Sequence, residues 1–132
     1  MSTFVLPKGS SYVAGAFLST VYMLIYQISL VVKARRKSNI KYPRAYAEKA
    51  EIEASPEAMA FNCAQRAHQN TLENIPMIYT STLITSIKYP VFSSAMLTIW
   101  SLSRVAYAAG YSSGNPEKRM NFLSTLHYPT IL

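Results

Sequence analysis

Two stretches of the sequence place charged and hydrogen-bonding side chains at helical spacing in otherwise apolar surroundings. The residues are Arg66, Asn70 and Glu73 at i, i+4 and i+7, and Arg104, Tyr107 and Tyr111 at i, i+3 and i+7. Each set would lie on one face of a helix. Because ionisable side chains are costly in apolar segments, both faces are candidates for a functional site.

A purely structural interpretation is also open. Arg66 and Glu73 could form an ion pair that fixes helix packing, and the two tyrosines could belong to an interfacial aromatic belt. The number of groups favours a ligand site, because an ion pair does not require further cations, phenols and an amide.

The chemistry of these groups suits a zwitterionic ligand. Arginines bind carboxylates through a bidentate fork, and a single glutamate suits an ammonium group. A remaining cation or phenol could stabilise a thiolate, lowering a thiol pKa from about 8.5 toward neutrality. Glutathione carries two carboxylates, one amine and one thiol, but the chemistry alone leaves it one of several anionic ligands.

The composition indicates that membrane-spanning helices position these groups. Half of the 132 residues are apolar and 14% are charged, whereas soluble domains have roughly 25% charged residues. Residues 12–32 form a run of 21 residues without a charge. As a helix this run would be about 31 Å long, which matches a hydrocarbon core of roughly 30 Å.

Two further spans are predicted for residues 57–87 and 91–111. Ser55 and Pro56 are typical of a helix start, with a capping hydroxyl followed by proline in the first turn. Residues 122–132 form an apolar stretch of about 16 Å as a helix, which is half a crossing. The sequence therefore predicts a single all-α membrane domain over residues 1–132, a four-helix bundle with a truncated fourth helix.

The basic residues predict the orientation. Thirteen Lys and Arg against six Glu give a formal charge of +7. Seven of the basic residues lie between Lys33 and Lys49, and Lys118 and Arg119 follow the third span. By the positive-inside rule these segments face the cytosol, where they also suit anionic lipid. Nucleic-acid binding is not expected, because no recognisable module frames these charges.

Cys63 is the only cysteine, so an internal disulfide and a thiolate metal cluster are excluded. No catalytic Cys/His arrangement surrounds it, and we expect it to pack in the core.

Two segments carry a family resemblance. FNCAQRAHQNTLENIP (Phe61–Pro76) and SRVAYAAGYSSGNPEKR (Ser103–Arg119) resemble the MAPEG family, and the similarity extends over roughly residues 33–119. The resemblance implies a homotrimer of four-helix subunits, with glutathione held at each subunit interface near the cytosolic side. It also implies the endoplasmic reticulum as the usual location, with the nuclear envelope and outer mitochondrial membrane as alternatives.

The resemblance also assigns binding roles. It implies that Glu73 binds the glutathione amine and Arg66 a carboxylate. Further contacts are implied for residues of the same two segments: His68, Gln69, Asn70, Arg104, Tyr107 and Tyr111.

The catalytic roles follow from the leukotriene C synthase branch of the family, in which an A-R-R sequence ends the first helix. Here it reads Ala34-Arg35-Arg36. The match implies that Arg35 binds glutathione, that Arg36 donates a proton to the electrophile and that Arg119 activates the thiol. Lys118 is the alternative to Arg119 if the loop gap is placed differently.

The chain departs from the family at two places. Asn74 stands where the synthase branch has a tyrosine that contacts glutathione, so this contact is not expected. The fourth helix stops at Leu132 and contains Pro129, which is unfavourable inside a helix.

The leading expectation is an enzyme that adds glutathione to a lipophilic electrophile or reduces a lipid hydroperoxide, without a metal or bound prosthetic group. The alternative is a non-catalytic lipid-binding member of the family or an inactive truncated form.

Overall fold

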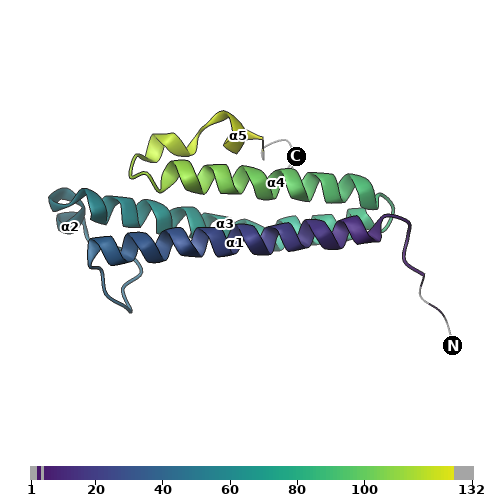
Figure 1. Cartoon of the computed structure of the whole chain (residues 1–132), viewed down its shortest axis with the longest axis horizontal. Helices are drawn as coiled ribbons and strands as arrows, with labels where there is room; N and C mark the ends of the chain where they lie inside the picture. Colours follow the sequence, from purple (N-terminus) through teal and green to yellow (C-terminus); the bar gives the residue numbers. More distant parts are fainter. Residues whose placement is uncertain (1–2, 4, 127–132) are drawn as a thin grey trace.

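Three long helices lie side by side and run the length of the molecule in alternating directions (Figure 1). They are α1 (Ser10–Ser38), α3 (Pro56–Ser86) and α4 (Pro90–Tyr111), joined by shorter elements: α2 (Lys49–Ala54), the 3-10 helix η1 (Pro116–Arg119) and α5 (Phe122–Thr125). This computed structural model describes residue 3 and residues 5–126. The α-helical bundle agrees with the predicted fold class.

The helix boundaries follow from local chemistry. Ser55 Oγ accepts a hydrogen bond from the backbone N–H of Ala58 at 3.4 Å, and Pro56 occupies the first turn of α3, as the sequence predicts. Helix α1 continues past the uncharged run and ends at Asn39, whose φ of 60° is left-handed. Three basic residues in the last turn of α1 interact favourably with the negative end of its dipole.

Apolar side chains pack along the bundle axis in successive clusters. One buried cluster joins all three long helices through Met23 of α1, Ile78 of α3, and Leu97 and Trp100 of α4. Another surrounds Cys63, which is buried against Tyr107 as expected for a packing residue. These contacts fix the relative register of α3 and α4, the two helices that carry the polar stripes.

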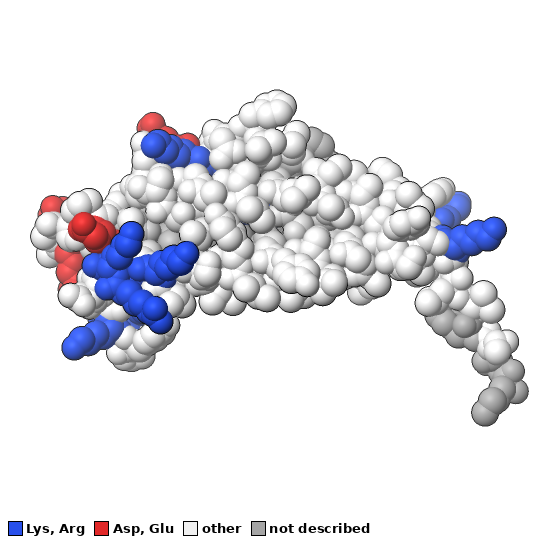
Figure 2. Space-filling model, viewed as in Figure 1, with Lys and Arg blue, Asp and Glu red and all other residues white. Residues whose placement is uncertain are grey.

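The face of the bundle shown in Figure 2 is apolar over its middle and charged at its ends. On the face shown in Figure 2, charged side chains gather at the end that carries α2 and around η1, and further basic side chains lie at the opposite end. Large apolar side chains such as Leu18, Ile25 and Leu102 are more than half exposed. Helix α1 is long and apolar enough to cross a bilayer, and 28% of its most apolar window is buried.

The segment that follows α4, with η1 and α5, folds back on α4. Helix α5 begins at Phe122, where the partial fourth span is predicted, and it packs along α4 (Figure 1). The remainder of that predicted span, residues 127–132 with Pro129, lies outside the described residues.

Candidate functional site

The polar stripe of α3 carries an ion pair on its surface. Arg66 Nη1 donates a hydrogen bond to Glu73 Oε1 at 3.0 Å, two turns along the helix. The two side chains are 46% and 48% exposed. Both charges therefore remain accessible to a ligand from outside the single chain.

Arg104 joins the stripe of α4 to that of α3. Its side chain donates from Nη2 to Asn70 Oδ1 at 2.8 Å and from Nε to Thr71 Oγ1 at 3.1 Å. The guanidinium lies 3.8 Å from the centre of the Tyr107 ring, and Arg104 is only 2% exposed. The guanidinium is thus buried and held in one orientation by contacts that include Asn70, Thr71 and Tyr107.

The contacts continue along α4 to η1. The rings of Tyr107 and Tyr111 meet edge to face with centroids 5.7 Å apart. Arg119 Nη1 then donates to the Tyr111 hydroxyl at 3.4 Å. The structure therefore connects Asn70, Arg104, Tyr107, Tyr111 and Arg119 in one continuous path of contacts. The Arg66–Glu73 pair lies on the same stripe of α3 as Asn70 but is not joined to this path by these contacts.

Side chains that the sequence analysis missed hold Arg119 in place. The Ser124 hydroxyl donates to the Arg119 carbonyl at 2.6 Å, and Asn121 Nδ2 donates to the Ala106 carbonyl of α4 at 3.1 Å. Because Gly110 has no Cβ, the backbone of Lys118 can approach α4 closely. Asn121 also caps α5, a pattern that a capping-box search could have found.

A buried polar layer supports the site from α1, and it too was not predicted. Gln27 is 1% exposed, and its Nε2 donates to Thr71 Oγ1 at 3.0 Å and to the Arg104 carbonyl at 3.2 Å. Its Oε1 lies 3.3 Å from His68 Nδ1. The sequence does contain a signal for this layer, because Gln27 is a polar amide within the uncharged run of residues 12–32.

Three predicted contacts lie elsewhere in the single chain. His68 faces α1 through Gln27, and Gln69 is exposed on α3. Arg35 is buried and donates from Nη1 to the carbonyls of Ile40 and Arg44, at 3.2 and 2.7 Å. Their glutathione contacts remain predictions, and in this chain Arg35 anchors the loop after α1.

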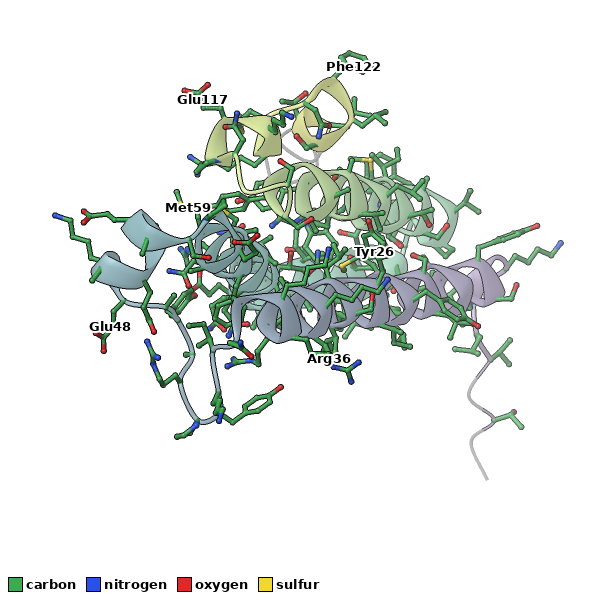
Figure 3. All side chains as sticks on the ribbon, turned by 60° about the vertical axis from the view of Figure 1, so that its left-hand side comes forward. Tyr26, Arg36, Glu48, Met59, Glu117 and Phe122 are labelled. Carbon is green, nitrogen blue, oxygen red and sulfur yellow. The ribbon has the colours of Figure 1, made fainter. Side chains whose placement is uncertain are left out.

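Arg36 also stands apart from the path. Figure 3 shows its side chain projecting away from the helices, and it is exposed at the surface of α1. Its predicted role therefore needs a ligand or a subunit on the outside of the bundle.

The arrangement can bind an anion more readily than a metal. Arg104 and Arg119 lie on the path, and Arg66 pairs with Glu73, the predicted acid, on the stripe of α3. Among residues 3 and 5–126, no three His, Cys, Asp or Glu side chains gather closely enough to hold a metal ion.

Comparison with known proteins identifies the family. The model of the MAPEG family matches residues 13–129, and no solved structure matches the chain. Membership of this family supports an integral membrane protein with a function related to glutathione. The match covers α1, α3, α4 and every predicted site residue, and the chain therefore belongs to the MAPEG family.

Proposed function

We propose that the protein is a glutathione transferase that activates glutathione as a thiolate and joins it to a lipophilic electrophile from the bilayer. The observation that carries this proposal is the path from Asn70 through Arg104 and the two tyrosines to Arg119. Arg104 and Arg119 belong to this path, and Arg66 pairs with Glu73 on the α3 stripe. Three arginines with one carboxylate suit a ligand that has more negative than positive charge.

The Arg66–Glu73 pair and the Arg119 end of the path have distinct tasks in this proposal. Glu73 accepts hydrogen bonds from the glutathione ammonium, and Arg66 binds a carboxylate. Arg119 stabilises the thiolate together with the Tyr111 hydroxyl, because both can donate to a sulfur anion. Fixed donors around a developing charge contribute to catalysis without reorganising during the reaction.

The same thiolate supports two reactions. With an epoxide, sulfur attacks carbon, the C–O bond breaks and Arg36 supplies a proton to the alkoxide. With a lipid hydroperoxide, sulfur attacks the terminal oxygen and the alcohol leaves. A second glutathione then gives the disulfide and water. Holding the thiolate beside a membrane-dissolved partner supplies proximity.

The position of Arg36 supports a site shared between subunits of a homotrimer. Since Arg36 projects away from the helices (Figure 3), whereas Arg119 lies on η1 packed against α4, we infer that Arg36 serves the site of a neighbouring subunit. Inactive Arg36→Ala and Arg119→Ala chains, co-expressed, should then regain activity in about one quarter of the sites, the fraction that receives both arginines. Activity that stays absent in verified mixed assemblies would place both arginines in one subunit.

Glutathione binding and the ultraviolet absorbance of the thiolate test the function directly. The purified protein in detergent should bind glutathione and show thiolate absorbance at neutral pH. Arg119→Ala should bind glutathione but lose the absorbance, whereas the matched variant Lys118→Ala should keep both. Glu73→Ala should lose binding. A properly folded wild-type protein that binds no glutathione would overturn the proposal.

A further inference from the structure

A cavity lies at the charged end of the bundle, apart from the proposed glutathione site. It has a volume of about 420 Å³ and opens between the end of α1, the start of α3 and the residues after α4. It is lined by Leu30, Lys33, Ala34, Lys37, Pro56, Glu57, Ala60, Ser112 and Ser113. None of these residues belongs to the contact path between Asn70 and Arg119, so the cavity is a separate feature.

The polar part of the lining suits a phosphate group. Lys33 and Lys37 are one helical turn apart and share a face of α1. Ser112 and Ser113 line the opposite wall, and their hydroxyls donate to the carbonyls of Ala109 and Gly110 at 3.2 and 2.7 Å. The donors that remain for phosphate oxygens are therefore the two lysine ammonium groups, which bind them through charge-assisted hydrogen bonds.

The charge balance leaves a net cationic site. Glu57 is the acid of the lining, and its carboxylate accepts a hydrogen bond from Ser55 and is attracted by Lys37. Among the residues that the structure describes, Lys33 has no carboxylate within ion-pair distance. An anion in the cavity would therefore find one cation available and a second only partly neutralised.

The remaining lining and the position of the cavity indicate a lipid rather than a soluble anion. Leu30, Ala34 and Ala60 form apolar walls beside the lysines. Lys33 directly follows the uncharged run of α1, so it lies where headgroups meet the hydrocarbon core. Basic residues in this position attract the anionic lipids of the cytoplasmic leaflet.

We propose that this cavity binds the phosphate of an anionic phospholipid, with Lys33 and Lys37 as its cationic contacts and the apolar walls against the start of the acyl chains. The bound lipid would bridge α1, α3 and the turn after α4. It would thereby stabilise the end of the bundle without entering the glutathione site.

Lipid titrations of delipidated protein in a neutral detergent test the proposal, with thermal unfolding and native mass spectrometry as readouts. Phosphatidylglycerol should bind saturably and raise the unfolding temperature more than phosphatidylcholine does. Lys33→Gln and Lys37→Gln should each weaken this binding about fivefold, the effect of one basic residue near an anionic surface. Ser113→Glu, which adds a negative charge at the rim, should remove the preference for phosphatidylglycerol.

Lys41→Gln is the matched control, because Lys41 belongs to the same basic segment but does not line the cavity. If it weakens binding as much as Lys33→Gln, the attraction is diffuse and the cavity is not the site. Equal effects of phosphatidylcholine and phosphatidylglycerol would also overturn the proposal, as would displacement of the lipid by equimolar inorganic phosphate. Retained glutathione binding in all variants would show that they are folded and that the two sites are independent.

Discussion

The carbonyl oxygen of Lys118 lies so close to Gly110 that a Cβ placed on this glycine would be 2.1 Å from it. The neighbouring carbonyl carbon would be only 2.9 Å away. These are backbone atoms, which cannot move aside as the end of a flexible side chain can. The absence of a side chain at Gly110 therefore sets how closely η1, and with it Arg119, lies against α4.

Replacing Gly110 with alanine should move η1 away from α4 and separate Arg119 from Tyr111. We expect a loss of stability of about 1–3 kcal/mol, as for an overpacked core position, and loss of the thiolate absorbance of bound glutathione. Gly15→Ala is the matched control, because nothing lies within 4 Å of a Cβ at Gly15. It should keep the thiolate signal. If Gly110→Ala keeps both stability and absorbance, the close approach does not position Arg119.

The polar stripes could be predicted because helical spacing alone decides which side chains share a face. The same spacing places His68 off the face of Arg66 and Asn70, and the structure indeed turns it toward Gln27. The segment around Arg119 follows no such rule. Its position depends on contacts of Asn121 and Ser124 with α4 and with the preceding turn, and no local periodicity encodes such contacts.

Gln27→Ala should destabilise the bundle, because it removes the amide that links α1 to Thr71 and to the Arg104 carbonyl. We expect the free energy of unfolding to fall by about 1–3 kcal/mol, because the variant leaves buried polar groups without hydrogen-bond partners. Unfolding in mixed detergent micelles would measure it. Ser29→Ala is a suitable control, since the Ser29 hydroxyl bonds only within its own helix, to the Tyr26 carbonyl. Equal stability of the two variants would exclude a structural role for the layer.

An ion pair between the loop after α1 and helix α2 should make the stability of the protein depend on pH. Arg44 forms a two-pronged ion pair with Glu51, with Nη1 donating to Oε1 at 3.0 Å, and this pair lowers the pKa of Glu51 from 4.5 to about 2. Because the pKa of Glu51 is lower in the folded state than in the unfolded state, the ion pair stabilises the fold fully at pH values above the unfolded-state pKa. It is lost as the pH falls through the folded-state value of about 2.

Glu51→Gln should therefore unfold at a lower temperature than the wild type at neutral pH, and the difference should disappear as the pH approaches about 2. Glu53→Gln provides the comparison, since its ion pair with Lys49 spans 3.8 Å and is highly exposed. This variant should unfold close to the wild type at neutral pH. A Glu51→Gln variant as stable as the wild type at neutral pH would contradict the expected role of the pair.

The A-R-R motif assigns both Arg35 and Arg36 to the glutathione site, but it does not predict how each side chain is oriented. In the structure, the Arg35 guanidinium lies 4.2 Å from the centre of the Tyr42 ring and 4.6 Å from that of Phe61. Arg36 is exposed. The difference arises from the helix itself, since adjacent positions on α1 point about 100° apart, so one faces the packed loop and the other the surface.

Alanine substitutions should separate these two roles. Arg35→Ala removes hydrogen bonds to two carbonyls and contacts with two rings, and we expect a loss of stability of about 2–4 kcal/mol. Arg36→Ala should leave unfolding unchanged, because its side chain has no comparable packing role, and it should abolish turnover, because the proposed proton donor is removed. Denaturant unfolding and glutathione affinity, measured on the same preparations, distinguish the outcomes. An Arg35→Ala protein with wild-type stability and no glutathione binding would show that Arg35 contacts the ligand rather than anchoring the loop.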